Sequence, residues 1–279
     1  MTEIASVPAA ADPGVLASVR EITEDPDDRT ALVEMSRRLR STKDGTLLAA
    51  VTGATPVGVG LLGAPTPGGP PTFEAVGPSV DALTALLGAA RERSAGPLQW
   101  WARGTALALA RWFVEHGEAT VEREVLRMER SLDPPPSTSL PVRPATAEDL
   151  PEVAEINALA FAQHPDRARM TLDDIRAHVD LLGGAPGDVL LDEGSPASGF
   201  CWLRRHPSRV GEIYVLAVRP EAQGRDLGRG LLSAGLVRLR AMGYDRAALY
   251  VDHDSPARAL YERNGFQDVG RSHLAVRIS

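Results

Sequence analysis

The chain has 279 residues, of which 43% are hydrophobic and 24% charged, and its formal net charge is −7. This composition predicts a soluble globular protein with room for two domains, and its acidic balance argues against a broad nucleic-acid-binding face. No apolar run approaches the ~20 residues of a membrane helix, and the first residues have neither a basic nor an apolar leader segment. We therefore expect a cytoplasmic protein with neither nucleic acid nor membrane as a partner.

The use of cysteine and histidine argues against disulfides and metal sites. Cys201 is the single cysteine, so no intrachain disulfide can form. It lies in the apolar stretch SGFCWL (198–203), which predicts a buried strand residue rather than a nucleophile. The six histidines are scattered, without the spacing of a His/Cys metal cluster. We expect no metal site.

The first half of the chain predicts strands that alternate with helices. The strand TFEAV (72–76) runs through GPSVDALTALLGAA (77–90) directly into a helix. The segment from Leu98 to Leu132 then predicts an apolar strand, a polar turn, a helix stopped by Gly117, and one or two further strands.

The stretch LDPPPSTSLPV (132–142) predicts a linker, because three consecutive prolines with serine and threonine disfavour a helix. We place the domain boundaries accordingly, with a first domain over 1–131, a proline-rich linker over 132–140 and a second domain over 141–279.

The second half has the clearer pattern of helices and strands. A helix over 147–162 follows a short strand, with Thr146 as a candidate N-cap and acidic residues in the first turn. Near the end, Ser255 and Pro256 are expected to open a helix. The remaining elements are a helix over 170–182, three antiparallel strands over 188–194, 198–206 and 211–218, a helix over 227–243, and strands over 246–251 and 274–279. The pattern predicts an α+β fold, a mixed sheet flanked by helices.

The two halves end alike, which indicates a diverged duplication. ARWFVEHG in the first half matches ARALYERNG in the second, and alignment of Gly117 with Gly265 sets Phe113 opposite Tyr261. We expect one copy of the same α+β fold in each half.

The segment GEIYVLAVRPEAQGRDLGRGLLSAGL (211–236) runs from a strand through a glycine-rich loop into a helix. The first turn of a helix offers unsatisfied N–H groups and a partial positive charge, which suit an anion, although such a loop alone can be a simple turn. Read together with ARALYERNGF (257–266), the segment resembles the GNAT acetyltransferase superfamily, whose members have V-x-P, then Q/R-x-x-G-x-G/A, then A-x-x-L-Y-x-x-x-G-F. Only the second half carries both motifs.

The resemblance implies two tandem GNAT-like domains and a role for each motif residue, with acetyl-CoA as co-substrate. A backbone N–H at Leu216 would polarise the thioester carbonyl, and Tyr261 would protonate the departing thiolate. Ser255 and the strand end would also contact acetyl-CoA. The expected acetyl-CoA-binding residues are Leu216, Ala217, Val218, Gln223, Gly224, Arg225, Asp226, Leu227, Gly228, Arg229, Gly230 and Ser255.

The amine that attacks the thioester must lose a proton, and Glu212 is the best candidate base, acting directly or through water. It stands four residues before Leu216, so a strand period of two predicts that both side chains share one face. The alternative is a solvated carboxylate at the start of the strand. Glu212, Leu216 and Tyr261 would then form the catalytic set.

The tandem layout resembles a two-domain actinobacterial branch of the superfamily, which acetylates the cysteinyl amine of a cysteine–glucosamine–inositol conjugate. The matching stretches are 160–170, 199–207 and 211–218, plus QWWARGT (99–105) in the first half. The resemblance implies that Asp166, Arg204, Glu212 and Tyr250 contact this substrate. Arg204 stands where a lysine is expected, which keeps the charge but changes the hydrogen-bond geometry. Solvated surface charges at Asp166 and Arg204, and a core strand tyrosine at Tyr250, are equally compatible with the sequence.

The first half departs from the family pattern, because it lacks the phosphate loop and has Phe113 in place of the acid. It either closes the substrate site or has a structural role, and the sequence favours neither. In the second half, Asp226 replaces a glycine. A carboxylate ~6 Å from a phosphate costs about 1.4 kcal/mol at an effective dielectric constant of ~40. Arg225, Arg229 and the helix N-terminus offset this cost, and we expect Asp226 to tolerate a left-handed backbone and to point to solvent.

Two alternatives remain open at this point. The chain could acetylate another small-molecule amine or a protein N-terminus, or it could be a catalytically weak acyl-CoA-binding module. Retention of Glu212 and Tyr261 argues against the second. We expect a monomer whose partner is a small-molecule amine.

Overall fold

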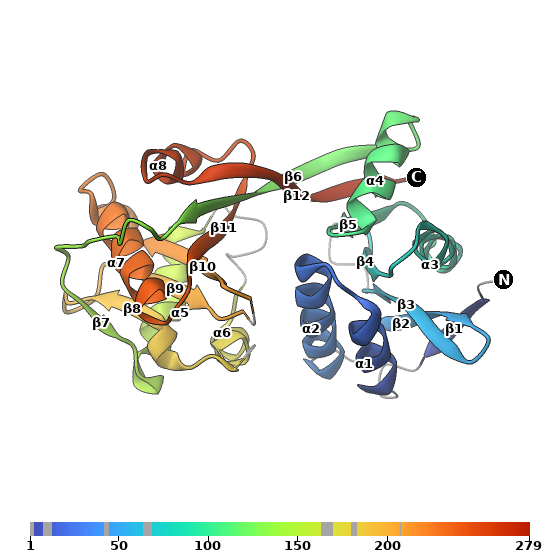
Figure 1. The fold of residues 1–279 in the computed structure, drawn as a ribbon, viewed down its shortest axis with the longest axis horizontal. Coiled ribbons are helices and arrows are strands. Elements are labelled where there is room, and N and C mark those ends of the chain that lie inside the picture. Colours follow the sequence, from blue (N-terminus) through green and yellow to red (C-terminus); the bar gives the residue numbers. More distant parts are fainter. Residues whose placement is uncertain are drawn as a thin grey trace. The chain divides into compact units, whose positions relative to one another are not determined.

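A computed structural model describes residues 3–7, 13–41, 45–63, 69–162, 170–179, 183–206 and 208–279. The chain forms two compact units, one of Met1–Leu126 with Ser272–Ser279 and one of Arg127–Arg271 (Figure 1). The predicted boundaries differ from these mainly at the end of the chain, where Ser272–Ser279 belong to the first unit. Among the described residues, no helix has the length and apolar character needed to cross a membrane.

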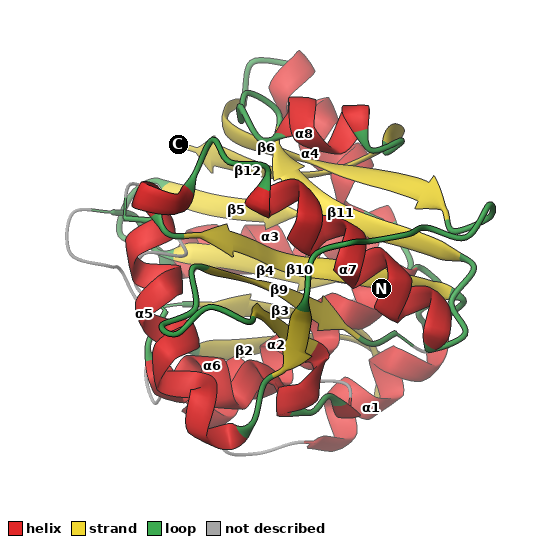
Figure 2. Ribbon diagram, turned by 90° about the vertical axis from the view of Figure 1, so that its left-hand side faces the viewer, coloured by secondary structure: helices red, strands yellow, loops and turns green. Residues whose placement is uncertain are grey.

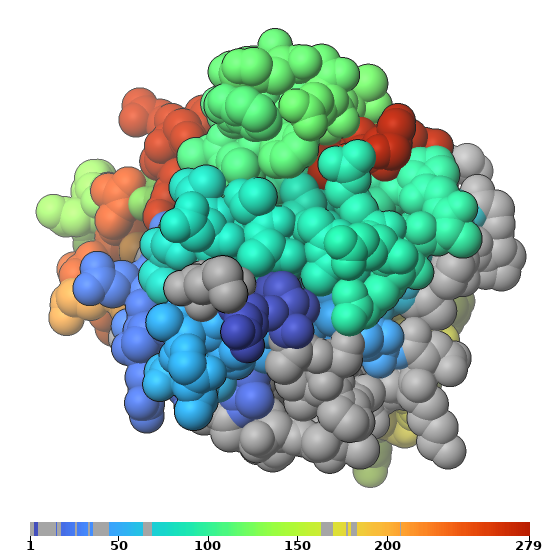
Figure 3. All heavy atoms as spheres, turned by 90° about the vertical axis from the view of Figure 1, so that its right-hand side faces the viewer, coloured from blue at the N-terminus to red at the C-terminus, as the bar shows by residue number. Residues whose placement is uncertain are grey.

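The first unit is a mixed sheet with helices, in which β4 and β5 run parallel. Its strand order is β1-β2-β3-β4-β5-β12, and the remaining neighbours are antiparallel. Helices α3 and α4 lie on the surface that Figure 3 shows in teal and green. The elements are β1 (Glu3–Val7), α1 (Pro13–Ile22), α2 (Pro26–Ser41), β2 (Thr46–Thr52), β3 (Thr55–Leu62), β4 (Thr72–Val76), α3 (Val80–Arg93), β5 (Leu98–Ala102), α4 (Ala106–Glu115) and β6 (Ala119–Ser131).

The second unit has the strand order β11-β10-β9-β8-β7, with β10 and β11 parallel and the other pairs antiparallel. Its helices and strands are distinguished by colour in Figure 2. Strands β6 and β12 each give residues to both units. The elements are β7 (Val142–Pro144), α5 (Leu150–Ala160), α6 (Leu172–Val179), β8 (Val189–Asp192), β9 (Gly199–Arg204), β10 (Val210–Val218), α7 (Leu227–Ala241), β11 (Arg246–Asp252), α8 (Arg258–Arg263) and β12 (Gln267–Ile278).

Helices cover both faces of the second sheet. On one face, Phe200 and Trp202 pack with Ile156 of α5 and Ile175 of α6 in one apolar core. On the other face α7 packs so closely that a Cβ on Gly235 would lie 2.6 Å from the Cys201 sulfur. Cys201 is fully buried, as predicted, and burial raises the pKa of its thiol to about 12.

The predicted repeat is visible in how α4 and α8 end. In α4 the N–H of Glu118 donates to the Phe113 carbonyl, and in α8 the N–H of Phe266 donates to the Tyr261 carbonyl. Gly117 and Gly265 both have a positive φ, of 74° and 81°. These are the bonds and the left-handed glycine of a Schellman-type helix end. The parallel pairs β4–β5 and β10–β11 precede these helices in the two units, which confirms the duplicated fold.

The link from β4 to α3 is short, as the sequence predicts. Strand β4 ends at Val76, α3 begins at Val80, and the hydroxyl of Ser79 accepts the N–H of Ala82. The first turn of α3 is therefore capped by its own chain. No glycine-rich loop precedes this helix, unlike α7.

Two expected helix starts have different outcomes. Thr146 is the N-cap of a short 3-10 turn over Ala147–Asp149, and its N–H and hydroxyl donate to the Asp149 carboxylate at 2.7 and 2.9 Å. The turn leads directly into α5, which begins at Leu150, later than predicted. The expectation that Ser255 and Pro256 open the last helix is wrong, because α8 begins at Arg258. A turn precedes it, in which the Ser255 hydroxyl accepts the Ala257 N–H at 3.3 Å. A short turn with Ser and Pro carries the same local signal as a helix start.

Asp28 of α2 is a buried carboxylate in the first unit. Its side chain is fully buried, and its Oδ2 accepts the N–H and hydroxyl of Thr105 at 3.2 and 2.8 Å. Its Oδ1 has no hydrogen-bond partner among the described residues and lies where a Cβ on Gly104 would stand. Burial, opposed by the hydrogen bonds from Thr105, raises the pKa of Asp28 to about 6.

We predict that Asp28→Asn stabilises the first unit at neutral pH. Because the folded pKa lies above the unfolded value, wild-type stability falls as pH rises from about 4 to 6 and stays lower above that. The amide resembles the protonated acid, so the variant should gain about 1–3 kcal/mol at pH 8 and almost nothing at pH 4. Thermal unfolding at the two pH values measures this difference. Asp81→Asn, at an exposed position in α3, is the control. An equal effect of Asp28→Asn at both pH values would contradict the prediction.

Candidate active site

The site residues of β10 follow an irregularity in the pairing of this strand with β9. Glu212 pairs with Arg204 and Ile213 with Leu203, but the next pair is Val215 with Trp202, so Tyr214 is an extra residue in the strand. Such a β-bulge reverses the alternation of side chains beyond it. Glu212 therefore shares its face with Val215 and Ala217.

The prediction that Glu212 and Leu216 share a face is thus wrong. Leu216 pairs with Cys201 and lies on the face that α7 covers, whereas Glu212 lies on the opposite face with Arg204. The strand period of two holds only where a strand pairs regularly, and the bulge lies between the two residues.

Strands β10 and β11 pair over only three residues, from Val210–Arg246 to Glu212–Ala248. Both strands continue beyond this point, β10 to Val218 and β11 to Asp252. The backbone of β10 that no longer pairs with β11 contains Leu216 and Val218, which are half-buried, and Ala217, which is buried. Amide groups at such an edge are available to a ligand.

A tight loop joins this end of β10 to α7. A short 3-10 turn over Pro220–Ala222 is followed by Gln223, whose side-chain amide donates to the Val218 carbonyl at 3.0 Å. Gly224 then has a φ of +75°. The loop residues Gln223, Gly224, Arg225 and Asp226 are exposed. The loop thus brings the N-terminus of a 15-residue helix to solvent directly beside the unpaired end of β10, the arrangement that suits an anion.

Asp226 is the N-cap of α7 and has a left-handed backbone, with φ 61° and ψ 2°. Among the described residues it is the one non-glycine residue with positive φ. Its side chain makes no capping hydrogen bond, is 78% exposed and lies 3.7 Å from a guanidinium nitrogen of Arg229. The expectation that Asp226 points to solvent is confirmed, and the residue has the left-handed backbone that it was expected to tolerate.

The glycines of the first turn of α7 have close neighbours. A Cβ on Gly230 would meet the Leu140 side chain at 3.0 Å, and a Cβ on Gly228 would lie 3.7 Å from Val218 and 3.9 Å from Leu260. Leu140, at the end of the predicted linker, thus packs against the start of α7. Leu260 of α8 reaches the same turn, so the two family motifs meet in space.

Glu212 is buried, with 6% of its side chain exposed, and its carboxylate has charged and polar neighbours. Its Oε2 lies 2.7 Å from Nε2 of His206 and 3.7 Å from Nη1 of Arg204, whose side chain is 6% exposed. A solvated carboxylate and a solvated Arg204 are thus both excluded. A buried carboxylate is retained where such donors compensate its loss of water.

Arg204 is also held by an aromatic ring. Its guanidinium carbon lies 3.5 Å from the centre of the Tyr214 ring, and the His178 ring of α6 stacks on the same tyrosine at 5.7 Å. The bulged residue thus fixes the arginine that faces Glu212. His206 and Tyr214 were not predicted. His206 could have been proposed from its place at the end of the strand predicted over 198–206, next to the strand that carries Glu212. Nothing in the sequence indicates the bulge that brings Tyr214 to Arg204.

The other predicted site residues lie in different surroundings. Tyr261 is half-buried in α8, with its ring edge-on to Phe266 at 6.0 Å. Tyr250 of β11 accepts a hydrogen bond from Arg127 at 3.2 Å through its hydroxyl. Asp166 lies outside the described residues. Within the described ranges, no group of three or more His, Cys, Asp or Glu side chains could hold a metal ion, and the absence of a metal site stays a prediction.

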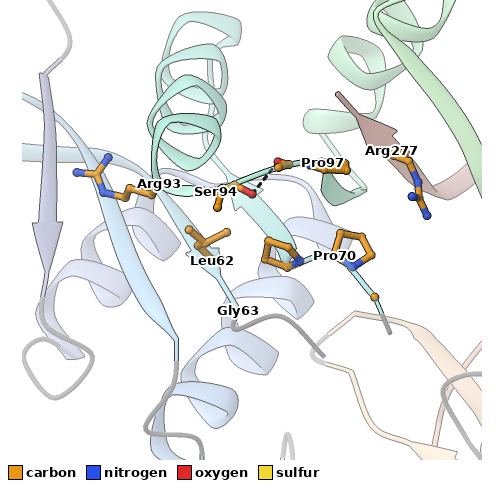
Figure 4. Close-up of a pocket in the computed structure, with 11 residues that line it drawn as sticks. Leu62, Gly63, Pro70, Arg93, Ser94, Pro97 and Arg277 are labelled. Atoms are coloured by element: carbon orange, nitrogen blue, oxygen red, sulfur yellow. Dashed lines mark hydrogen bonds between the residues drawn. The ribbon is translucent and has the colours of Figure 1, made fainter. Parts of the chain in front are cut away.

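A pocket of about 580 Å³ lies in the first unit, flanked by Arg93 and Arg277 (Figure 4). Arg93 donates to the Ala89 carbonyl, and Arg277 pairs with Glu122. Prolines, glycines and main chain line most of the rest, and no predicted site residue contributes to it. It is therefore separate from the candidate site.

Comparison with known proteins agrees with this architecture. Residues 151–266 match the family described as Acetyltransferase (GNAT) family. The chain is similar to a mycothiol acetyltransferase of Thermomonospora curvata, with 40% identity over 191 residues, 65% of this chain and 64% of that protein. The matched region thus spans less than two thirds of that relative. A mycothiol acetyltransferase of Kocuria rhizophila is 36% identical over 69% of each chain.

A solved structure supports the tandem fold. A tandem GNAT protein from the clavulanic acid biosynthesis pathway matches with a TM-score of 0.66 and 15% identity, over 100% of this chain and 98% of that one. The fold is therefore that of two tandem GNAT domains. The chain belongs to the mycothiol acetyltransferase family, within the acetyltransferase (GNAT) superfamily.

Proposed function

We propose that the second unit transfers an acetyl group from acetyl-CoA to the cysteinyl amine of a cysteine–glucosamine–inositol conjugate, giving mycothiol and CoA. The observation that carries the proposal is 36–40% identity to mycothiol acetyltransferases. The buried Glu212, the glycine-rich start of α7 and Tyr261 support it, because the same unit retains a base, an anion site and an acid.

In this proposal the loop and the end of β10 bind acetyl-CoA. The amides of the first turn of α7, with Arg225 and Arg229, would hold the pyrophosphate. Leu216, Ala217 and Val218 would line the pantetheine and acetyl group. These residues lie on the stretch of β10 that does not pair with β11, so an amide there can donate to the thioester carbonyl.

Proton transfers complete the reaction. Glu212, directly or through water, takes the proton that the amine loses as its nitrogen bonds to the carbonyl carbon. The N–H of Leu216 stabilises the negative charge that forms on the carbonyl oxygen. The carbon–sulfur bond then breaks, and the Tyr261 hydroxyl gives its proton to the leaving thiolate. Arg204, Tyr250 and Asp166 would contact the sugar–cysteine substrate.

The first unit is proposed to have no acetyl-CoA site of this kind. Ser79 caps α3 where the second unit has its loop, and Phe113 has no proton to give. A buried polar group, in which Arg103 bridges Glu34 and Glu74 and Thr105 binds Asp28, occupies this unit instead. These contacts support a structural role for that region.

The proposed substrate is tested by CoA release from acetyl-CoA. We expect turnover with the cysteine–glucosamine–inositol conjugate and none with the same sugar lacking cysteine, because only the first offers the cysteinyl amine. Turnover with other amines alone would identify a different GNAT acetyltransferase. Binding of acetyl-CoA without CoA release, for any amine tested, would instead indicate an acyl-CoA-binding module.

Tyr261→Phe tests the acid. The substitution removes the hydroxyl and keeps the ring that packs on Phe266, so we expect kcat to fall about 10²-fold or more while the KM for acetyl-CoA changes little. Steady-state kinetics and thermal unfolding are compared with those of the wild type and of His116→Phe, a substitution at an exposed residue of the first unit. Full activity of Tyr261→Phe would remove the acid assignment.

Asp226→Gly tests the charge in the loop. Glycine adopts the left-handed backbone freely and removes a negative charge near the proposed pyrophosphate, so we expect tighter acetyl-CoA binding by up to about 10-fold. Asp226→Asn keeps a residue that tolerates this backbone and removes only the charge, so it separates the two causes. Calorimetric titration with acetyl-CoA measures the affinity. An unchanged or weaker affinity in both variants would refute a charge penalty.

A further inference from the structure

To act as a base, the Glu212 carboxylate needs a hydrogen-bond partner that holds its orientation, in addition to a neighbouring positive charge. A base in a proton transfer must present its carboxylate oxygen to the amine in one orientation. Glu212 belongs to the last registered pair between β10 and β11, beyond which the two strands no longer pair. Only 6% of its side chain is exposed, so bulk solvent contributes little to its orientation. Its orientation therefore depends on the protein groups that touch it.

Arg204 and His206, which both lie near the carboxylate, differ in what they can do. Arg204 at 3.7 Å is a charge neighbour beyond normal hydrogen-bond length, and its guanidinium is stacked on Tyr214. His206 at 2.7 Å is within the range of a short, charge-assisted hydrogen bond. An ionised carboxylate has only acceptors, so Nε2 of His206 carries the hydrogen and donates it. This contact allows His206 to fix the direction of the Glu212 carboxylate.

His206 is itself held in place by Tyr244. The hydroxyl of Tyr244 accepts the His206 N–H at 3.1 Å and donates to the His206 carbonyl at 3.2 Å. The Tyr244 ring lies against Gly211, where a Cβ would stand 2.8 Å from a ring carbon. Gly211 directly precedes Glu212 in β10, so one tyrosine ties the histidine to the residue next to the base.

We propose that His206 is a positioning residue for Glu212, which holds the carboxylate through an Nε2–H donor and is anchored by Tyr244. The inference rests on the proposed function, in which Glu212 is the base. His206 acts through Glu212 and does not itself exchange a proton with the amine. The contact is made by a residue just after β9 and is independent of the loop that binds acetyl-CoA.

Two substitutions of His206 separate a donor from a packing role. Phenylalanine keeps a ring but has no N–H donor, whereas glutamine keeps a donor and loses the ring. We expect His206→Phe to lower kcat about 10- to 100-fold with the KM for acetyl-CoA within about twofold of wild type. We expect His206→Gln to recover most of this loss. If packing alone mattered, the order of the two variants would be reversed.

Tyr244→Phe provides a variant that leaves the His206 ring intact. It removes the hydroxyl that holds the His206 backbone, so kcat should fall by a smaller factor, roughly 2- to 10-fold. His116→Phe is the matched control, because His116 is an exposed residue just after α4 in the first unit and stacks on Trp112. It should leave kcat unchanged. Thermal unfolding of every variant identifies any that fails to fold.

Glu212→Gln, alone and combined with His206→Phe, distinguishes failure of the inference from failure of the proposed function. If His206 acts through Glu212, the double variant should be no slower than Glu212→Gln. Wild-type activity of Glu212→Gln would overturn the base and with it the proposed mechanism. An inactive Glu212→Gln beside a fully active His206→Phe would overturn only the positioning role. A further loss in the double variant would show that His206 acts independently of Glu212.

Discussion

Between Ile213 and Val215, strand β10 has one residue more than β9 can pair with. The arrangement of side chains in the candidate site depends on this extra residue. The bulge directs Glu212 and Arg204 to the face of α5 and α6, and Leu216 to the face of α7. The extra residue is Tyr214, whose ring then holds the Arg204 guanidinium at 3.5 Å. A bulge that re-aims side chains beside a site is a common use of this irregularity.

The candidate site in the second unit therefore has two parts, a group of side chains around Glu212 and a group of backbone amides at the start of α7. The side-chain groups Glu212, His206 and Arg204 are held on one face by Tyr214 and Tyr244. The proposed anion-binding groups are backbone amides of the loop over 223–226 and of the first turn of α7. Because the two parts share few residues, we expect substitutions in the loop to change the affinity for acetyl-CoA without changing the proposed proton transfer to Glu212. Asp226 illustrates this freedom, since its charge points to solvent and leaves the turn intact.

The first unit has the same helix ends and the same parallel strand pair, but different polar chemistry. Glu74 lies at the last of the three registered β4–β5 pairs, as Glu212 does in β10–β11. In the first unit this carboxylate pairs with Arg103, which also binds Glu34 of α2. Asp28 of α2 is fully buried and accepts hydrogen bonds from Thr105. Its raised pKa means that the ionised carboxylate lowers the stability of the folded unit at neutral pH. The duplicated fold thus carries an internal ionic cluster in one unit and the candidate site in the other.

The order of elements in the second half, the duplication and the glycine-rich start of α7 could be predicted from the sequence alone, as could the tolerance of Asp226 for a left-handed backbone. These features follow from local rules: helical and strand periods, helix-end glycines and the backbone tolerance of aspartate. The face of Glu212, its pairing with His206 and the place of Ser272–Ser279 in the first unit became clear only from the tertiary structure. These depend on strand register and on contacts between distant residues, where one extra residue in β10 reverses every side chain beyond it.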